Sequence, residues 1–304
     1  MTSDGFLVVD KQPGWTSHDV VARCRRLLGT RKVGHAGTLD PDATGVLIVG
    51  IGRATRLLRF ASALPKIYVG EVVLGVTTSS LDSSGEVTAH FDMGGIGLED
   101  VREAARSLTG RIEQTPPMVS AVKVGGRRLH ELAREGIEVE RAPRAIEVFR
   151  FEVFDTGESD TYRILVECSS GTYVRVLAAD VGVRLGGGAY LRALRRVSVG
   201  SFHDIEALAL DEVAPERVRP PEELLRDLPG AVARPDLAQA LGHGRAVERL
   251  ALGVVGDGPW AVVDQSGRLV AVCAPLGLER VKPVVVLQPG DGSHADAGSP
   301  TDDE

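Results

Sequence analysis

The sequence has 304 residues, of which 43% are hydrophobic and 25% are charged, values that are ordinary for a globular protein in water. This length exceeds the usual size of one domain, so we expect a large domain and a smaller one. No run approaches the roughly 18 uninterrupted apolar residues that a membrane-spanning helix needs, and no membrane attachment is expected.

The N-terminal residues lack the basic and apolar segments of a secretory signal, which predicts a cytoplasmic protein. The three cysteines, Cys24, Cys168 and Cys273, are far apart in the sequence, which argues against a disulfide framework and a thiolate zinc site. The formal net charge is -7, but basic residues cluster at positions 23–32 and 192–196. Net charge therefore neither supports nor excludes a nucleic-acid partner.

The first elements follow from apolar spacing. A strand is predicted at 6–9, and a helix is predicted from Thr16 or Ser17 to about Leu28, because its apolar residues recur at steps of three and four. Residues 34–44 contain too many turn formers for a regular element and predict a loop. The apolar run at 45–50 that follows predicts a buried strand.

Later segments predict further strands at 68–74, 146–153 and 162–168 and helices at 98–108 and 172–185. Strands and helices do not alternate regularly, so an α+β fold is favoured over a doubly wound parallel sheet.

The character of the sequence changes near Pro220. Residues 1–220 are predicted to form the large domain, and 221–288 a small β-rich domain with two strands around the turn at 264–267 and another at 284–287. Residues 289–304 have a composition that predicts a disordered tail.

Residues 34–45 read GHAGTLDPDATG and place glycines and carboxylates in one loop, with Asp40 presented beside flexible backbone. This composition is suitable for close contact with a ligand. It is equally typical of a tight turn in which Asp40 and Asp42 bond to nearby backbone, because Asp before Pro favours turns. The residues alone leave both interpretations open.

The same loop resembles the catalytic loop of the TruB family of tRNA pseudouridine synthases. Asp10-Lys11 with Pro13-Gly14 resembles the N-terminal motif of the family, and segments at 114–126, 168–180 and 194–202 resemble its later motifs in the same order. The resemblance covers residues from about 5 to 205. One departure is His130, where the family usually has tyrosine, and the C-terminal part matches only loosely.

The resemblance implies a catalytic domain with a mixed, largely antiparallel sheet, an RNA-contacting insertion at about 92–145 and a PUA-like C-terminal domain. It implies that uridine 55 in the T stem-loop of tRNA is isomerised to pseudouridine after base flipping. No cofactor, metal or protein partner is implied, and a monomer is expected.

Three residues match catalytic positions of the family. Asp40 matches its essential aspartate, acting either as nucleophile or as base. Arg175 matches the arginine that keeps this carboxylate ionised, although a surface ion pair is its ordinary role. Tyr68 matches the tyrosine that stacks on uracil and helps to remove the C5 proton, although a half-buried strand aromatic is the common alternative.

Other matches imply contacts to substrate. His35 matches the residue that fills the space left by the flipped base, Tyr173 and Leu194 match the uracil pocket, and Asp82 matches a nearby polar position; core packing or a turn is the alternative for each. Predicted phosphate contacts are Lys11, Lys123 and the arginine clusters, although exposed basic residues are often only solvated.

Three other functions compete with this interpretation, the first being a nucleotide-cofactor oxidoreductase. Gly50 and Gly52 after an apolar run imitate a dinucleotide-binding loop, but Thr55 replaces the third small residue. A noncatalytic RNA-binding or RNA-folding protein on the same scaffold is disfavoured by the retained Asp40, Tyr68 and Arg175. A guide-RNA-dependent pseudouridine synthase shares the motifs, but the sequence is more similar to the stand-alone kind.

Overall fold

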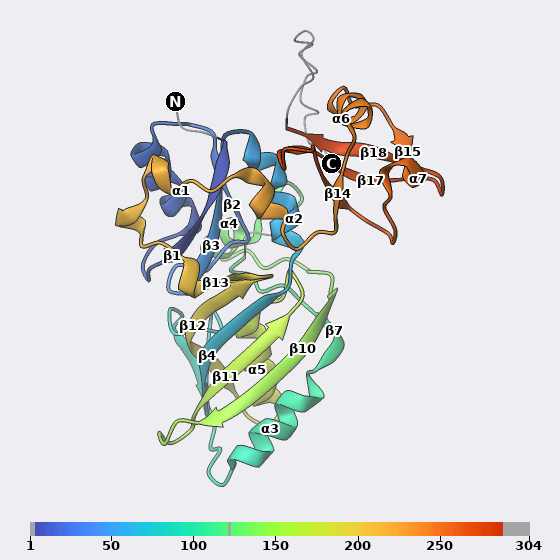
Figure 1. The fold of residues 1–304 in the computed structure, drawn as a ribbon. Coiled ribbons are helices and arrows are strands. Elements are labelled where there is room, and N and C mark those ends of the chain that lie inside the picture. Colours follow the sequence, from blue (N-terminus) through green and yellow to red (C-terminus); the bar gives the residue numbers. More distant parts are fainter. Residues whose placement is uncertain (1–3, 121–122, 288–304) are drawn as a thin grey trace.

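The structure is a computed structural model that describes residues 4–120 and 123–287 (Figure 1). Its larger sheet has nine strands among these residues. They are β1 (Gly5–Lys11), β2 (Val33–Ala36), β3 (Thr44–Ile51), β4 (Lys66–Leu74), β7 (Gly110–Gln114), β10 (Arg144–Asp155), β11 (Thr161–Cys168), β12 (Ala189–Val199) and β13 (Phe202–His203).

The strand order is β1-β3-β12-β4-β11-β10-β7, with β2 beside β3 and β13 beside β12. Every pairing in this sheet is antiparallel except that of β12 with β3, which is parallel. The sheet thus consists of two antiparallel halves. One contains β2, β1 and β3, and the other contains β13, β12, β4, β11, β10 and β7; the parallel pairing of β12 with β3 joins them. The predicted α+β class with a mixed, largely antiparallel sheet is confirmed.

Helix α1 (Ser17–Leu28) has the predicted bounds. The Thr16 hydroxyl accepts from the Asp19 amide, and the Asp19 carboxylate accepts from the Thr16 amide, so both ends of the capping box are made. Its buried face, which includes Val20, Cys24 and Leu28, packs against β1 and β3. The arginines of α1 lie away from this core, as an amphipathic helix requires.

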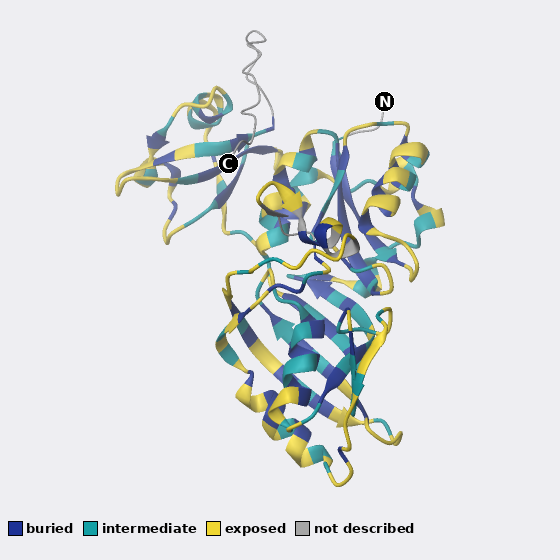
Figure 2. Cartoon of the chain, turned by 180° about the vertical axis from the view of Figure 1, so that it is seen from behind, coloured by how far each residue is buried: buried dark blue, intermediate teal, exposed yellow. Residues whose placement is uncertain are grey.

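The second half of the sheet is covered on one side by α3 (Leu98–Ser107) and α5 (Val174–Arg184), which contact β10 and β12 respectively (Figure 1). Burial follows the strand centres and the inner faces of these helices (Figure 2). Shorter elements are α2 (Leu58–Ala63), α4 (Leu129–Arg134) and the hairpins β5 (Val76–Thr78) with β6 (Val87–His90) and β8 (Lys123–Val124) with β9 (Arg127–Arg128).

The segment predicted as an insertion at 92–145 divides into two parts. Helix α3 and strand β7 belong to the main core and sheet, because Val101 and Ala105 are fully or almost fully buried there. The stretch from β8 to α4 is instead a separate excursion between β7 and β10.

The C-terminal sheet has the order β14-β16-β17-β18-β15. Its elements are β14 (Gly230–Val232), α6 (Pro235–Gly242), β15 (Val247–Glu248), α7 (Arg249–Leu252), β16 (Trp260–Val263), β17 (Leu269–Leu276) and β18 (Arg280–Val286). The predicted pair of strands around 264–267 is present as β16 and β17. Residues 288–304, including the predicted tail, lie outside the described residues.

The two parts of the chain share a hydrophobic core at their junction. Leu224 and Leu225, in a 3-10 helix at Pro221–Leu225, are buried together with Phe6 of the large sheet and Val272 of the small one. Arg56 and Arg59 near α2 also donate hydrogen bonds to the carbonyls of β18. The change of architecture near residue 220 is therefore a packed junction.

Several elements, such as β7 and α6, were not predicted, and two of the differences bear on the site. Strand β12 was not predicted, because three arginines interrupt its alternation of apolar and polar residues. Arg192 and Arg195 form ion pairs, and Arg196 is buried. The loop predicted at 34–44 begins later than expected, because residues 33–36 form β2 and pair with β3. The turn formers are confined to 37–43, which we call the Asp40 loop.

Gly45 tests the junction of β3 with β12. It has a φ of 100°, and a Cβ atom there would lie 2.2 Å from the carbonyl oxygen of Arg196. Gly45→Ala is expected to reduce the free energy of unfolding by about 3 kcal/mol or more, measured by urea denaturation. The matched control is Gly157→Ala, with φ 77° and open space around the Cβ position. It should cost only about 1–2 kcal/mol; equal losses would contradict this account.

Candidate active site

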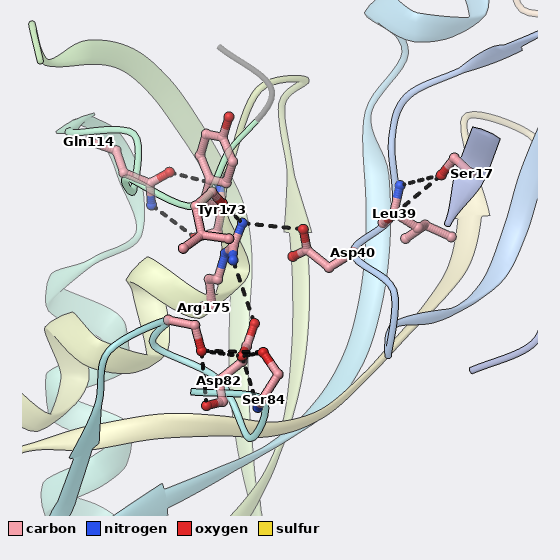
Figure 3. Close-up of polar contacts among 10 residues, drawn as sticks. Ser17, Leu39, Asp40, Asp82, Ser84, Gln114, Tyr173 and Arg175 are labelled. Carbon is pink, nitrogen blue, oxygen red and sulfur yellow. Dashed lines mark hydrogen bonds and ion pairs between the residues drawn. The ribbon is translucent and has the colours of Figure 1, made fainter. Parts of the chain in front are cut away.

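The Asp40 loop is held against the start of α1 by backbone contacts. The Ser17 hydroxyl accepts from the Leu39 amide at 2.9 Å and lies 3.3 Å from the Leu39 carbonyl (Figure 3). The Gly14 amide donates to the Pro41 carbonyl at 3.0 Å. The backbone on both sides of Asp40 is therefore fixed, which positions its carboxylate before any ligand binds.

Lys11 is part of this support. Its side chain is fully buried, and Nζ donates to the carbonyls of Gln12, Trp15 and Pro41 at 3.1, 2.6 and 2.7 Å. Burial lowers the pKa of Lys11 to about 8, against the opposing attraction of Asp42 and Asp40. The prediction that Lys11 contacts phosphate is wrong, because its ammonium group points inward and is already bound to three carbonyls.

Arg175, in the first turn of α5, connects two carboxylates. Its Nη2 lies 3.2 Å from Asp40 Oδ1 and 2.6 Å from the Val119 carbonyl, and its Nη1 lies 3.5 Å from Asp82 Oδ2 (Figure 3). The Arg175 side chain is 4% exposed, whereas that of Asp40 is 40% exposed. Arg175 is thus a buried support, and Asp40 is the group presented to solvent.

Asp82 is oriented by two serines that the sequence analysis did not single out. The hydroxyls of Ser80 and Ser84 donate to Asp82 Oδ1 at 2.5 and 2.6 Å, and the Ser84 amide donates to the same oxygen at 3.1 Å. These bonds leave Oδ2 to face Arg175. The available signal was serine two residues before and after an aspartate, a pattern typical of side-chain turns.

The pKa of Asp40 is set by several opposing effects. Removal of water by the surrounding protein raises the pKa of Asp40 above its usual value, Arg175 and Lys11 oppose this, and Asp82 and Asp42 add to it. The expectation that Arg175 favours the ionised form is correct in direction. Its effect is nevertheless exceeded by desolvation.

A cavity of about 330 Å³ opens beside Asp40. It brings together five of the predicted residues: Asp40, Tyr68, Tyr173, Arg175 and Leu194. Its other lining residues are Gly37, Thr38, Leu39, Ser62, Lys66, Ser120, Ser169, Gly171, Thr172, Val174 and Arg196. This volume is at the small end for a ligand pocket and is suitable for a planar heterocycle.

The two tyrosines reach the cavity from different elements. Tyr68, on β4, is 8% exposed, and burial raises its pKa while Arg196 opposes the shift. Tyr173 precedes α5, and its backbone is clamped by Gln114, whose side chain accepts from the Tyr173 amide at 2.7 Å and donates to its carbonyl at 3.1 Å. Gln114 is therefore a support that the motif contained but whose role was not predicted.

His35 does not line the cavity. It lies half-buried on β2, and its ring meets that of His18 edge-on at 5.4 Å between centroids. Burial and the nearby His18 and Arg196 lower the pKa of His35 to about 4, so the ring is neutral near pH 7. Its buried Nδ1 has no hydrogen-bond partner among the described residues.

The arginines at 192–196 were predicted as phosphate contacts, and this is wrong for Arg196, whereas Arg192 and Arg195 are held in ion pairs with carboxylates. Arg192 pairs with Glu71 and Glu158, and Arg195 pairs with Asp10 and Asp204, while Arg196 is buried. Of the cluster at 23–32, Arg25 donates to the Val33 carbonyl, and Arg26 is exposed. The backbone of Lys123 lies in β8, but its side chain lies outside the described part of the structure.

The remaining sequence alternatives can be judged from the fold. The segment at Gly50 and Gly52 ends a strand paired antiparallel on both sides, and the Asp4 carboxylate binds the Arg53 amide there at 2.6 Å. This is not a dinucleotide-binding turn. Among residues 4–120 and 123–287, no group of three or more His, Cys, Asp or Glu side chains is arranged to hold a metal ion. No helix in the described part of the chain is long and apolar enough to cross a membrane.

Comparison with known proteins identifies the family. Residues 25–174 match the TruB family pseudouridylate synthase (N terminal domain). The chain is 46% identical over 291 residues to the tRNA pseudouridine synthase B of Mycobacterium sp. (strain KMS), with 94% of this chain and 96% of that protein covered. The chain belongs to the TruB family. The TruB-family protein of Mycobacterium tuberculosis (strain CDC 1551 / Oshkosh), also named tRNA pseudouridine synthase B, is 43% identical, with 95% and 97% covered.

Two solved structures have a similar fold. The matching chain in the crystal structure of a Cbf5-Nop10-Gar1 complex has a TM-score of 0.73 and 26% identity, with 93% of this chain and 84% of that chain covered. A chain of an H/ACA RNP bound to a substrate RNA containing 2'-deoxyuridine has a TM-score of 0.72 at 23% identity, with 94% and 86% covered, and shows the fold alone. The predicted pseudouridine-synthase fold with a PUA-like C-terminal domain is confirmed.

Replacing Arg175 tests its three-way contact. Arg175→Lys is expected to lower kcat/KM for pseudouridine formation by about 100-fold, because a lysine cannot reach Asp40, Asp82 and the Val119 carbonyl together. Arg184→Lys, at the exposed end of the same helix, is the matched control and should stay within about twofold. Retained activity in Arg175→Lys would show that a positive charge alone is sufficient.

The raised pKa of Asp40 predicts the acid side of the pH profile. Activity that needs the ionised carboxylate is lost as the pH falls through this pKa, and the loss should begin at a higher pH than for an ordinary aspartate. Asp82→Asn removes a neighbouring negative charge and should move the acid limb to lower pH. The measurement is kcat/KM against pH for both proteins, and an unmoved limb would exclude this coupling.

Proposed function

We propose that this enzyme isomerises uridine 55 in the T loop of tRNA to pseudouridine. The observation that carries the proposal is the placement of a partly exposed Asp40 at a cavity of about 330 Å³, with Arg175 behind the carboxylate and Tyr68 in the wall. The name shared by the curated relatives, tRNA pseudouridine synthase B, supports tRNA as the substrate.

The reaction is an isomerisation and needs neither a redox cofactor nor a metal. The bond from ribose C1' to uracil N1 breaks, the base turns and C1' bonds to C5. The C5 proton leaves and N1 gains a proton, so that product and substrate are isomers. Asp40 starts this sequence as a nucleophile or as a base, and both roles require an ionised carboxylate within reach of the ribose. Arg175 orients Asp40 and favours its charged form.

The cavity would hold the detached uracil while it turns. Tyr68 stacks on the base and assists removal of the C5 proton, and Tyr173 and Leu194 supply apolar contacts. A stacked uridine cannot reach Asp40, so it must be flipped out at a cost of a few kcal/mol. His35, neutral near pH 7, would occupy the space that the base leaves and offset part of this cost.

RNA contacts beyond the cavity are assigned to exposed segments. The excursion between β7 and β10, which includes Lys123, and the C-terminal domain would contact the T stem-loop, whose folded shape is recognised more than its sequence. We propose a catalytic domain at 1–220, an RNA-binding domain at 221–288 and a tail at 289–304. The enzyme would act as a cytoplasmic monomer without a protein partner.

The decisive experiment uses unmodified tRNA transcripts without cofactor, metal or guide RNA. We expect one pseudouridine, at position 55, mapped at single-nucleotide resolution. Asp40→Asn should lower the rate of pseudouridine formation by more than about 1000-fold, because its amide can act neither as nucleophile nor as base. Asp42→Asn, an exposed carboxylate in the same loop, is the matched control and should stay within about threefold.

Two other outcomes would change the proposal. A folded wild-type protein that binds tRNA without forming product would favour a noncatalytic role in RNA folding. Product that appears only when a guide RNA is added would favour a guide-dependent enzyme.

A further inference from the structure

Arg196 lines the cavity but is buried, unlike the exposed basic residues with which RNA-binding proteins contact phosphate. It lies on β12 and is 1% exposed, so it cannot contact phosphate from this position. Its Nε donates to the Val46 carbonyl at 2.7 Å and its Nη2 to the Gly37 carbonyl at 3.0 Å. A buried guanidinium is costly unless its donors are satisfied, which indicates a specific use.

The two carbonyls lie at opposite ends of the Asp40 loop. Gly37 begins the loop after β2, and Val46 follows it in β3. The backbone at position 196 also pairs directly with Gly45. Arg196 therefore holds both ends of the segment that presents Asp40, through its side chain and its main chain.

The same residue reaches Tyr68. Arg196 and Tyr68 are opposite one another in the register of β12 and β4, so their side chains leave the sheet on the same face. Tyr68 and Arg196 both line the cavity, and the charge of the Arg196 guanidinium acts against the rise in the Tyr68 pKa that burial causes. One planar cation thus binds the Asp40 loop and faces the tyrosine of the cavity wall.

We propose that Arg196 is a positioning residue that fixes the Tyr68 hydroxyl relative to Asp40. This inference rests on the proposed function, because it gives Tyr68 a place in the same reaction. Arginine is suited to the task because its rigid fork directs several N–H groups in one plane, whereas lysine offers a single flexible point charge. Arg195, next along β12, has no such link, because it pairs with Asp10 and Asp204.

The test is a double-mutant cycle with Arg196→Lys and Tyr68→Phe, measured as single-turnover rates of pseudouridine formation. Arg196→Lys should lower the rate by about 30-fold in the wild-type background, through misplacement of the hydroxyl. In the Tyr68→Phe background it should lower the rate by a smaller factor, about fivefold, because the hydroxyl is already absent and only the support of the Asp40 loop is lost. Equal losses in both backgrounds would overturn the proposal and leave Arg196 with a purely structural role.

Arg195→Lys is the matched control, and its effect should be the same factor in both backgrounds. The activity of the wild-type enzyme distinguishes failure of the proposed function from failure of the proposed role of Arg196. Absence of product from the wild-type enzyme contradicts the proposed function, whereas normal wild-type activity with additive losses contradicts only the role of Arg196. Thermal unfolding of each variant identifies any that is misfolded, and Arg196→Gln then replaces Arg196→Lys in the cycle.

A spectroscopic measurement tests the contact without any need for activity. The protein has four tyrosines, so tyrosine labelled with 13C at Cζ gives few resonances, and Tyr68→Phe assigns one of them. The Tyr68 resonance should shift in Arg196→Lys and stay in place in Arg195→Lys, because it responds to the position of the charge beside the hydroxyl. An unchanged resonance in Arg196→Lys would overturn the proposal.

Discussion

Two residue pairs, Arg195 with Thr44 and Arg196 with Gly45, join β12 to β3 in parallel and connect the two antiparallel halves of the large sheet. The rest of the site depends on this junction. Asp40 comes from a loop of the first half, whereas Tyr68 comes from a strand of the second. Because glycine at position 45 lets the two backbones approach closely, the distance between these side chains is set by main-chain pairing.

Four arginines at or near the cavity are bound by groups of the protein itself. Arg175 supports Asp40 and Asp82, Arg192 and Arg195 each bind two carboxylates, and Arg196 binds carbonyls. The attraction for RNA must come from the remaining exposed basic residues, locally and over short distances.

Elements and site residues could be predicted from the sequence where a local pattern and its physical cause coincide. The amphipathic spacing of α1 and the uninterrupted apolar run of β3 produced the correct elements, and the motifs placed Asp40, Tyr68 and Arg175 in one pocket. Burial and structure could not be predicted where the hydrogen-bond partners of a charged side chain are backbone groups that the local pattern does not identify. Lys11 was taken as exposed, and β12 was missed, since neither a buried ammonium nor a buried guanidinium can be recognised without its partners.

The role of two serine hydroxyls beside Asp82 could not be predicted from the sequence either. The contacts of Ser80 and Ser84 to Asp82 are local, but their value depends on Arg175, which lies in a helix far along the chain. Desolvation of Asp40 likewise depends on the complete fold, so the upward direction of its pKa could not be read from neighbouring residues.

The core shared by the two sheets has a consequence for how the protein comes apart. Leu269, Val272 and Val285 of the C-terminal part are buried in the same cluster as Phe6 and Val199 of the large sheet. Detaching either part would expose this apolar surface to water, at roughly 25 cal/mol per Å². The chain should therefore melt as one cooperative unit, with a single calorimetric peak whose van't Hoff and calorimetric enthalpies agree.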